Sequence, residues 1–477
     1  MKNMTLLNIE KACRGELIFP GSVREVERIG GSNAARDAAE AAAVVIDSRL
    51  VGAGSVFIAT RGERVDGHSF IAGAVAKGAL GIVCEEAPVF GETEIPYILV
   101  QDSFQALRDI AVFYRSQLQI PIVGITGSVG KTSTKEFVAG VLAQKYRVCK
   151  TAGNFNNEIG VPLTLLQIRP EHEAAVLEMG INHFGEMHRL SEIARPDICV
   201  MTNIGRCHLE FLGSREGVLR AKSEIFDFMN PQGHVCVNGD DDMLATVGQI
   251  TSHETCHFGL QSSNQIYATD IVSKGLFGME AMIHAKGGQA AFAVQITIPG
   301  EHMVYNALAA TNVGLLLGMT TEEISRGIAS VQAVGGRSNI LKTTRYTIID
   351  DCYNANPASM KAAIDLLTTA PGRKVAVLGD MFELGELEKE MHREVGHYAA
   401  QAGIDQILCA GPLATYIAGG AKAETEATQT TLPQISYFTT RDELLNGISS
   451  YLKEGDTVLI KASHGMQFEK VVEYLVK

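Results

Sequence analysis

The sequence predicts an α/β protein of three domains: a central P-loop-type parallel sheet with helices on both faces, a C-terminal Rossmann-like domain and a smaller N-terminal α/β domain. Length is the first reason, because 477 residues at roughly 150 residues per domain amount to about three domains. The second is the alternation of short apolar runs with helical stretches, which is typical of parallel sheets covered on both faces. The third is a glycine-rich loop that follows residue 125, between an apolar run and a helical stretch.

The composition narrows the class of protein. With 46% hydrophobic and 20% charged residues, the chain is neither disordered nor fibrous. A formal net charge of −13 argues against a nucleic-acid partner, which would need a basic surface. Residues 1–18 are charged throughout, unlike a signal peptide, and no apolar stretch is long enough to span a bilayer. We therefore expect no membrane insertion.

Nine cysteines are scattered singly through the chain, without a CxxC pair. Single cysteines in apolar surroundings are typical of reduced thiols in a cytoplasmic protein. A zinc site is not expected.

Changes in the pattern of apolar runs, turns and helical stretches indicate the domain boundaries. We predict domains at 1–118, 119–335 and 336–477. The first block mixes short apolar runs with glycine-rich turns: strands are expected at 55–59 and 81–84, and a helix at 104–117.

The second block begins with an apolar run that is suited to a buried parallel strand. Its predicted strands are 120–125, 174–178 and 197–201, followed by short alternating pieces over 254–298 and an apolar helix at 306–317. The third block alternates strands with helices again. Its predicted strands are 346–349, 374–378, 406–410 and 457–460, and its predicted helices include 359–367 and 386–401.

The glycine-rich loop has the features of a phosphate cradle. Residues 126–132 (TGSVGKT) follow a predicted strand and precede a helix-compatible stretch at 133–142. Gly127 and Gly130 let backbone N–H groups approach phosphates at the positive end of the helix dipole. Lys131 can reach the β and γ phosphates, and Thr132 can ligate Mg²⁺.

The loop departs from the common pattern, because Ile125 stands where a glycine is usual. The alternative is an ordinary glycine turn with a surface lysine. The flanking strand and helix favour an ATP site, whose predicted residues are Thr126, Gly127, Ser128, Val129, Gly130, Lys131, Thr132 and Ser133.

Three further side chains are candidates for the metal that accompanies a nucleotide. Glu178 ends a predicted buried strand, where a sheet edge would face the phosphate loop. His208 follows the next strand, and Lys222 lies in a helical stretch. Each also has an ordinary reading: Glu178 as an ion-pair partner, His208 as a polar core residue, and Lys222 as a solvated helix residue.

Taken together, these residues resemble the Mur ligase family, ATP-dependent enzymes that form amide bonds in peptidoglycan precursor synthesis. The similarity covers nearly the whole chain. It is carried by the phosphate loop and by segments 154–162 (NFNNEIGVP), 178–186 (EMGINHFGE), 208–210 (HLE), 350–357 (DDCYNANP), 378–385 (LGDMFELG) and 461–463 (KAS). Within the family, these segments are most similar to the enzymes that add D-alanyl-D-alanine to UDP-MurNAc-tripeptide.

The resemblance implies ATP and Mg²⁺ as cofactors and assigns roles to the candidates. Thr132 and Glu178 would hold one Mg²⁺; Glu178, His208 and Lys222 would hold a second, with Lys222 carbamylated by CO₂. A carbamate turns a repelling cation into an anionic oxygen ligand. The catalytic residues would be Lys131, Glu178, His208 and Lys222. Further ATP contacts would come from Asn306, Arg337 and Asp351.

The resemblance also implies which residues bind the substrates. Segments 47–49 (DSR), 54–59 (GSVFIA) and 66–70 (DGHSF) resemble the family's uridine-nucleotide-binding domain. The implied substrate-binding residues are Ser48, Arg49, Asp66, His68, Asn154, Asn157, Asn354, Asn356, Lys461 and Ser463. One departure stands at His464, where the family usually has an arginine, whose planar fork histidine cannot reproduce.

The resemblance therefore implies that UDP-MurNAc-tripeptide and D-alanyl-D-alanine are joined through an acyl phosphate. We expect the chain to act as a monomer. Other readings stay open. One is another amide ligase of this type, such as the diaminopimelate- or lysine-adding enzyme or a glutamate-adding relative like folylpolyglutamate synthase. The others are a P-loop kinase or motor ATPase, and a binding protein with an inactive nucleotide fold.

Overall fold

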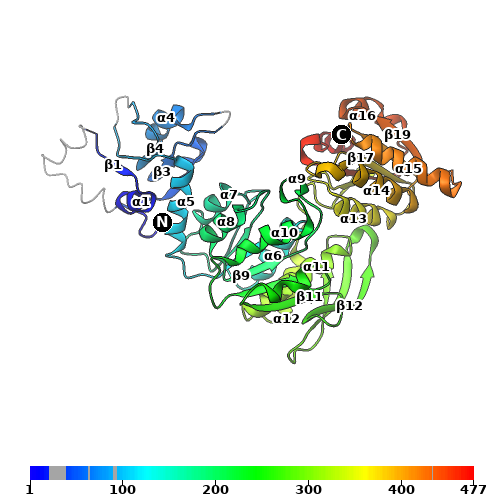
Figure 1. Cartoon of the computed structure of the whole chain (residues 1–477), viewed down its shortest axis with the longest axis horizontal. Helices are drawn as coiled ribbons and strands as arrows, with labels where there is room; N and C mark the ends of the chain where they lie inside the picture. The colour runs from blue at the N-terminus through cyan, green and yellow to red at the C-terminus, as the bar shows by residue number, and fades with distance from the viewer. Residues whose placement is uncertain (21–38, 63–64, 90–93, 432) are drawn as a thin grey trace.

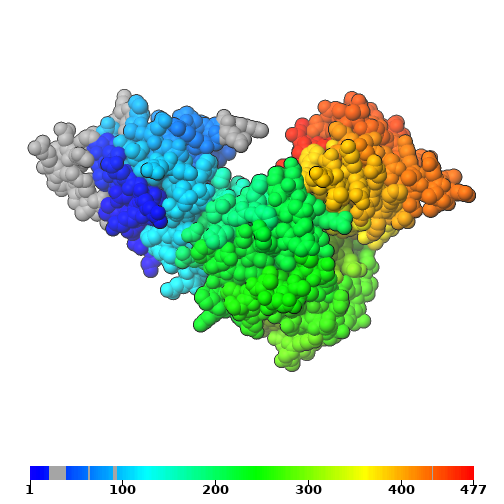
Figure 2. Space-filling model, in the orientation of Figure 1, coloured from blue at the N-terminus to red at the C-terminus, as the bar shows by residue number. Residues whose placement is uncertain are grey.

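The computed structural model describes residues 1–20, 39–62, 65–89, 94–431 and 433–477 and contains three sheets. Each sheet lies within one of the three predicted domains, whose boundaries stay a prediction. The N-terminal and C-terminal domains stand on opposite sides of the central one (Figure 1). The surface is hollowed into a wide notch between these two outer domains (Figure 2).

The N-terminal sheet has five strands in the order β1-β5-β4-β3-β2. Its strands are β1 (Glu16–Ile18), β2 (Ala43–Val45), β3 (Ser55–Ile58), β4 (Gly81–Cys84) and β5 (Tyr97–Leu99), and its helices are α1 (Leu6–Cys13), α4 (Ile71–Ala76) and α5 (Ser103–Arg115). Helix α5 begins where the Asp102 carboxylate accepts hydrogen bonds from two backbone N–H groups.

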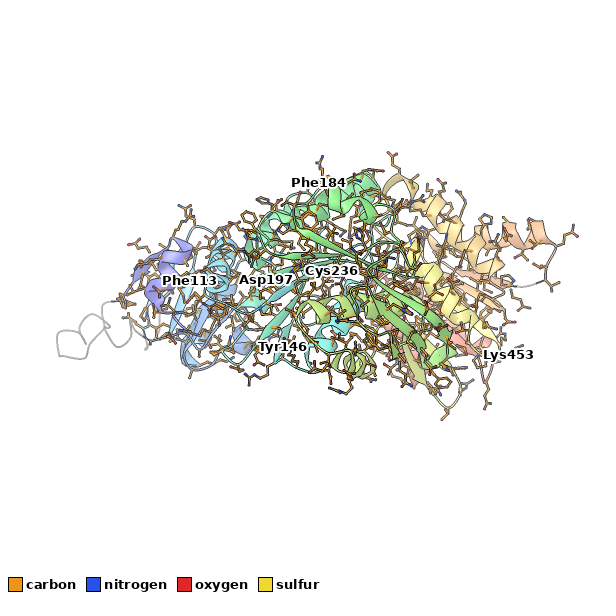
Figure 3. The ribbon with its side chains drawn as sticks, turned by 90° about the horizontal axis from the view of Figure 1, so that it is seen from below. Phe113, Tyr146, Phe184, Asp197, Cys236 and Lys453 are labelled. Atoms are coloured by element: carbon orange, nitrogen blue, oxygen red, sulfur yellow. The ribbon has the colours of Figure 1, made fainter. Side chains whose placement is uncertain are left out.

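Helix α5 fastens this domain to the central one. The Tyr114 hydroxyl donates to the carbonyl of Ile168, and the Arg115 guanidinium donates to the carbonyls of Ala194 and Arg195. Apolar residues of both domains share one hydrophobic cluster around this helix. The view from below shows the domains in a row, with Phe113 labelled in the N-terminal domain and Asp197 in the central one (Figure 3).

The central sheet has nine strands in the order β14-β13-β12-β11-β10-β9-β6-β8-β7. Its strands are β6 (Ile122–Thr126), β7 (Val148–Lys150), β8 (Ala174–Glu178), β9 (Ile198–Met201), β10 (His234–Asn238), β11 (Glu254–Gly259), β12 (Ile266–Ser273), β13 (Met279–Ala285) and β14 (Phe292–Ile296). Its helices are α6 (Lys131–Leu142), α7 (Gly160–Leu165), α8 (Glu186–Ala194), α9 (Leu209–Leu212), α10 (Arg215–Ser223), α11 (His302–Leu316) and α12 (Thr321–Ser330).

Strands β6, β8 and β9 are buried along their whole length because apolar clusters cover both faces of the sheet. Since they are parallel neighbours, their carboxyl ends meet at one edge. The phosphate loop follows β6 at that edge. This arrangement is the one in which α/β proteins bind ligands.

The C-terminal sheet has six strands in the order β15-β16-β20-β17-β18-β19. Its strands are β15 (Asn339–Lys342), β16 (Thr347–Asp350), β17 (Lys374–Gly379), β18 (Gln406–Ala410), β19 (Gln434–Phe438) and β20 (Thr457–Lys461), and its helices are α13 (Pro357–Thr368), α14 (Glu388–Gln401), α15 (Ala414–Thr428), α16 (Arg441–Gly447) and α17 (Glu469–Val476). Apolar clusters again cover both faces.

The predicted strands and helices are confirmed, with ends that differ by a few residues. The expectation of purely parallel sheets was too simple. Antiparallel strands lie at one side of each sheet: β1 beside β5, β13 and β14 beyond β12, and β15 beside β16. Antiparallel neighbours need only short connections, whereas parallel ones need a crossover.

The hairpin between β12 and β13 reaches the C-terminal domain. Leu276 at its tip packs against the apolar cluster of that domain, and the Lys342 ammonium lies 4.6 Å from the ring centroid of Phe277. All nine cysteines, each in the described part of the chain, are free thiols. Among the described residues, no helix has the length and apolarity needed to cross a membrane.

Candidate active site

A cavity of about 1330 Å³ opens where the three domains meet. Its floor is the phosphate loop and the carboxyl edge of the central sheet. One wall comes from the C-terminal domain, around Arg337, Tyr353 and Lys461, and the N-terminal domain contributes Arg108 from the middle of α5. The cavity is therefore bounded by all three domains.

The phosphate loop has a shape that its glycines permit. Gly127 has φ +144°, and a Cβ there would lie 1.9 Å from the Thr202 hydroxyl oxygen. Gly130 has φ +85° immediately before α6. Gly127 has no room for a side chain, and the φ of Gly130 would strain any other residue, so both glycines permit a loop whose backbone N–H groups are accessible at the start of the helix.

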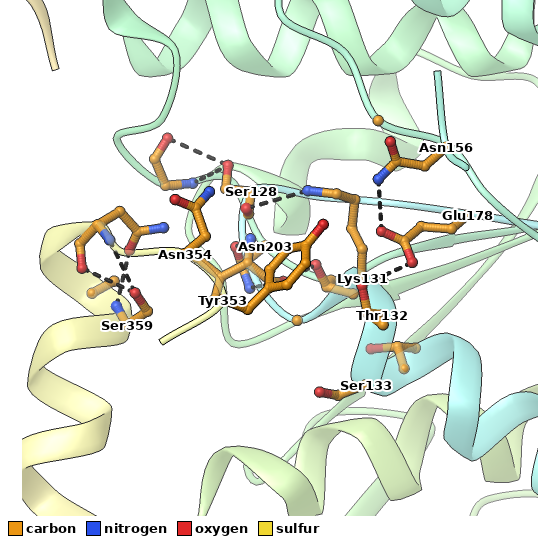
Figure 4. Close-up of a pocket in the computed structure, with 18 of the residues that line it drawn as sticks. Ser128, Lys131, Thr132, Ser133, Asn156, Glu178, Asn203, Tyr353, Asn354 and Ser359 are labelled. Atoms are coloured by element: carbon orange, nitrogen blue, oxygen red, sulfur yellow. Dashed lines mark hydrogen bonds between the residues drawn. The ribbon is translucent and has the colours of Figure 1, made fainter. Parts of the chain in front are cut away.

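Residues that follow β9 support this loop. The Asn203 amide oxygen accepts a hydrogen bond of 3.0 Å from the N–H of Val129, and the Ser128 hydroxyl accepts one of 2.8 Å from the N–H of Gly205. Figure 4 shows Ser128 and Asn203 close to Lys131. The loop is therefore held in place before any nucleotide binds.

The ammonium of Lys131 lies against the phosphate loop to which this lysine belongs. Its ammonium donates hydrogen bonds to the carbonyls of Gly127 at 2.8 Å and Ser128 at 3.4 Å. Among the described residues, no carboxylate forms an ion pair with it, and burial lowers its pKa. The positive charge is thus available to an anionic ligand.

Thr132 and Glu178 are brought into direct contact. The Thr132 hydroxyl donates to Glu178 Oε2 at 2.8 Å, and the Asn156 amide donates to Oε1 at 2.8 Å (Figure 4). Lys135 is almost fully buried, with its ammonium 3.8 Å from Glu178 Oε2 and donating to the carbonyl of Thr151. Glu178 is 2% exposed, so these contacts compensate for its buried charge.

Lys222 is the opposite of a solvated helix residue. Its side chain on α10 is 0% exposed, and its ammonium has no hydrogen-bond partner in the described structure. Burial lowers its pKa to about 8. A buried lysine without a partner is costly to keep charged, so this amine is suited to become neutral or modified. Lys222 is not among the described residues that line the cavity, and the charges of Cys207 and Lys131 also influence its pKa.

His208 lines the cavity but contacts the C-terminal domain rather than Glu178. Its Nδ1 lies 2.6 Å from Oε2 of Glu383, in the loop after β17. The sequence grouped Glu178, His208 and Lys222. The structure places all three around the phosphate loop without direct contacts between them in the described residues.

The predicted nucleotide residues outside the loop line the same cavity. The Asn306 amide oxygen, on α11, accepts a hydrogen bond from the Thr134 hydroxyl. The Arg337 guanidinium lies 3.9 Å from the ring centroid of Tyr353, at the opposite wall of the cavity. Asp351 accepts from the ammonium of Lys461 at 2.5 Å. The predicted Ser133 also lines the cavity, and the Thr126 hydroxyl is buried with no hydrogen-bond partner among the described residues.

The predicted substrate residues fall into two groups. Asn154, Asn157, Asn354, Asn356 and Lys461 line the large cavity. Two of the asparagines also begin helices: the Asn157 side chain accepts from the N–H groups of Ile159 and Gly160 ahead of α7, and Asn356 caps α13. These two side chains therefore have a structural role as well.

The second group lies outside this cavity. Arg49 is largely exposed and pairs with Asp47 beside Ser48. His68 lies 2.6 Å from the Asp66 carboxylate through Nδ1 and accepts from the N–H of Glu85 through Nε2.

In the C-terminal domain, the Ser463 hydroxyl accepts from the N–H of Phe382 and is buried. His464 is exposed, with its ring centroid 5.4 Å from that of Tyr353.

Several cavity residues were not predicted from the sequence, and four of them have clear roles. Asn156 and Asn203 support Glu178 and the phosphate loop, Tyr353 stacks with Arg337, and His302 lies beside Asn306 at the start of α11. Position alone could have indicated two of them. Asn156 stands between two predicted asparagines, and Asn203 follows a strand that neighbours β6.

The donor set fits Mg²⁺ better than a metal held entirely by protein. In the described ranges, no three His, Cys, Asp or Glu side chains gather as a preformed metal site. Mg²⁺ keeps several waters and is usually held by one or two carboxylates together with substrate phosphates. Glu178 and Thr132 beside the phosphate loop supply that kind of site. The unpartnered Lys222 amine would add oxygen ligands if carbamylated.

Comparison with known proteins places the chain in a family. Models named Mur ligase family, catalytic domain; Mur ligase middle domain; and Mur ligase, glutamate ligase domain match residues 40–115, 125–314 and 336–464. The UDP-N-acetylmuramoyl-tripeptide–D-alanyl-D-alanine ligase of Bacillus subtilis is 38% identical over 91% of this chain and 93% of its own. The chain belongs to the Mur ligase family.

The fold of this chain is also similar to that of Mur ligases whose structures have been solved. A crystal structure of MurF from Acinetobacter baumannii has a TM-score of 0.85 at 32% identity and covers 99% of this chain and 98% of its own. MurF from Thermotoga maritima in complex with ADP has a TM-score of 0.77 at 32% identity, covering 91% and 96%. A UDP-N-acetylmuramoyl-L-alanyl-D-glutamate–2,6-diaminopimelate ligase shares the fold at 16% identity, with a TM-score of 0.52.

Proposed function

We propose that this Mur ligase joins D-alanyl-D-alanine to UDP-MurNAc-tripeptide with ATP and Mg²⁺, giving UDP-MurNAc-pentapeptide for peptidoglycan synthesis in the cytoplasm. The observation that carries the proposal is the match to D-alanyl-D-alanine ligases along all three domains. The cavity supports it, because a nucleotide loop faces walls from both outer domains. A simple ATPase would not need those walls.

The chemistry follows from the energetics of amide formation. A free carboxylate does not condense with an amine in water, so ATP first activates it. The terminal carboxylate of the tripeptide attacks the γ-phosphorus of ATP, ADP leaves, and an acyl phosphate forms. The amine of D-alanyl-D-alanine then attacks the acyl carbon, and the tetrahedral intermediate expels inorganic phosphate while the nitrogen loses a proton.

The phosphate loop stabilises the charge that moves during the first step. Its N–H groups and the Lys131 ammonium would face the phosphates, and hydrogen bonds with Asn203 and the Gly127 carbonyl hold them in place before the reaction. Preorganised donors of this kind supply much of the stabilisation in phosphoryl transfer. Mg²⁺, when bound by Thr132 and Glu178, would neutralise phosphoryl oxygens and reduce repulsion between the two anions.

Lys222 supports a second metal position. The neutral amine would attack the carbon of CO₂ and lose a proton, which gives a carbamate. Its burial without a hydrogen-bond partner favours a neutral amine. With Glu178 and His208, this carbamate would complete the second set of oxygen and nitrogen ligands.

The two ends of the nucleotide-linked substrate would bind in different domains. Ser48 and Arg49, with Asp66 and His68 nearby in sequence, would hold the uridine diphosphate. The cavity asparagines and Lys461 would face the peptide end. Asn306, Arg337 and Asp351 would hold ATP from the side of α11 and of the C-terminal domain.

The alternative is a relative that adds diaminopimelate or lysine to a shorter peptide. The diaminopimelate ligase shares only the fold with this chain, whereas the D-alanyl-D-alanine ligases match it throughout at higher identity. A lysine- or diaminopimelate-adding activity would produce UDP-MurNAc-tripeptide rather than consume it.

The first experiment measures phosphate release from ATP and Mg²⁺ with UDP-MurNAc-tripeptide, with and without D-alanyl-D-alanine, and identifies the product by mass. We expect release that depends on the dipeptide, with UDP-MurNAc-pentapeptide as product. Hydrolysis indifferent to both substrates would contradict the proposal. Product formation only with UDP-MurNAc-dipeptide and a single amino acid would favour the alternative.

A further inference from the structure

The cavity contains a contact between domains that the proposed mechanism does not use. His208, just before α9, places Nδ1 at 2.6 Å from Oε2 of Glu383, in the loop after β17 of the C-terminal domain. Nδ1 is buried and has no aligned hydrogen-bond partner in the described part of the chain, so the carboxylate lies at hydrogen-bond distance but off the N–H direction. Rotation of the imidazole ring alone would change the angle between the N–H bond and the carboxylate oxygen. The distance brings a carboxylate of one domain to a proposed metal ligand of another.

Both residues have an unusual backbone. His208 has φ +52° and Glu383 has φ +61°, although neither is glycine. A non-glycine residue in the left-handed region costs roughly 1–2 kcal/mol. Such strain persists only where the surrounding structure imposes it, and it is concentrated at functional sites. Here it occurs on both sides of one contact.

Neighbouring contacts dock the two segments. Leu209, next to His208, packs against the apolar clusters of both the central and the C-terminal domains. Gly385, two residues after Glu383, lies against the backbone of Glu210. Arg206 and Glu394 approach to 3.9 Å but are both exposed, so that pair adds little. Glu383 thus reaches His208 only while the C-terminal domain is docked on α9.

We propose that Glu383 is a positioning residue for His208: it keeps the proton on Nδ1 and directs Nε2 toward the phosphate loop. The inference rests on the proposed function, in which His208 is an Mg²⁺ ligand. Metal-bound histidines usually donate their other ring N–H to a carboxylate, which fixes the tautomer and the ring orientation. Nε2 of His208 has no hydrogen bond or ion pair elsewhere in the described ranges. Because Glu383 belongs to the C-terminal domain, docking of that domain orients a ligand of the central one.

The test measures metal binding directly. Mn²⁺ is titrated into the full-length chain with ADP, and free Mn²⁺ is followed by electron paramagnetic resonance. Glu383→Ala should weaken Mn²⁺ binding by about tenfold, the usual effect of losing such a partner. Glu383→Gln, which keeps a neutral acceptor, should recover part of that loss. The matched control is Glu390→Ala, an exposed carboxylate of the same domain without an ion pair in the described structure, which should bind as the unmodified chain does.

A cycle with His208→Ala shows whether Glu383 acts through His208. His208→Ala alone should weaken Mn²⁺ binding by about tenfold or more, and adding Glu383→Ala should cause no further loss. In activity assays, Glu383→Ala should raise the Mg²⁺ concentration needed for half-maximal rate, while kcat at saturating Mg²⁺ stays within about threefold. Unchanged thermal melting of each variant confirms folding.

The outcomes separate the inference from the proposed function. If His208→Ala weakens Mn²⁺ binding and Glu383→Ala does not, the positioning role is wrong and the metal role of His208 stands. An equal further loss when Glu383→Ala is added to His208→Ala also overturns the inference. If His208→Ala itself leaves Mn²⁺ binding unchanged, the metal set in the proposed function is wrong, and the positioning role falls with it.

Discussion

The buried lysines of the central domain and of the C-terminal domain have different partners. On the central-domain side, the ammonium of Lys131 contacts only carbonyl oxygens, and that of the fully buried Lys222 contacts no partner in the described structure. On the C-terminal side, the ammonium of Lys461 is paired with the Asp351 carboxylate at 2.5 Å and also donates to the carbonyl of Asn354. Lys461 is 3% exposed, so burial alone does not explain the difference.

The presence or absence of a carboxylate partner distinguishes two kinds of lysine. Lys131 and Lys222 can bind a ligand, whereas the ion pair of Lys461 stabilises the C-terminal wall of the cavity. A buried charge without a counter-charge is unfavourable unless a ligand supplies one. For Lys131 the proposed ligand is phosphate, and for Lys222 it is CO₂. Lys461 already has its counter-charge, so its removal or that of its partner should affect stability as well as binding.

The largest effect is expected at Lys131. Lys131→Ala should lower the ligation rate about 1,000-fold or more, since it removes a preorganised charge at the transferred phosphate. The fold should persist, as measured by circular dichroism and thermal melting. Lys145→Ala, which removes an exposed lysine after α6, serves as control. A Lys131→Ala protein that ligates at the unmodified rate would place phosphate stabilisation elsewhere.

Lys222→Ala should reduce turnover about 100-fold, because a metal ligand is lost while the phosphate loop remains. A short carboxylate such as acetate should restore part of the rate, since it can occupy the position of the carbamate. Lys222→Arg, which keeps the positive charge but has no amine to carbamylate, should be as inactive as the alanine variant. Full activity of Lys222→Ala without any addition would exclude the carbamate.

The ion pair of Lys461 with Asp351 predicts an effect on stability. Asp351→Asn should lower the free energy of unfolding of the C-terminal domain by about 2 kcal/mol, because Lys461 would stay buried with only carbonyl partners. Urea unfolding followed by tryptic cleavage within this domain measures the change. An unchanged unfolding midpoint would mean that the carbonyls of Asp351 and Asn354 are sufficient for Lys461.

The smallest effect is expected outside the cavity, at Arg49. Its side chain is 87% exposed, so Arg49→Ala should leave stability unchanged. It should raise the KM for UDP-MurNAc-tripeptide about tenfold, the effect of losing one charge-assisted hydrogen bond. The KM for ATP should not move. Lys11→Ala, an exposed change in the same domain, is the control, and an equal rise in both KM values would contradict a uridine-side role for Arg49.

Features that are local in the sequence could be predicted, and features that depend on packing could not. The phosphate loop and Glu178 are set by a strand and the residues directly after it, so the sequence indicates both. Lys222 has the appearance of a solvated helix residue until the neighbouring elements cover it. The contact of His208 with Glu383 joins two domains, and no spacing within either segment reveals it.

The hairpin between β12 and β13 has a mechanical consequence for the C-terminal domain. A body held at one point can turn about three axes, a body held at two can turn about one, and three separate points fix it. Among the described residues, the C-terminal domain is held by the chain that leads into β15, by Leu276 and Phe277 at the hairpin, and by the segment from His208 into α9. Release of the last contact alone would leave a single hinge line through the other two. The opening and closing of the cavity would then follow one path, along which Glu383 returns to the same place beside His208.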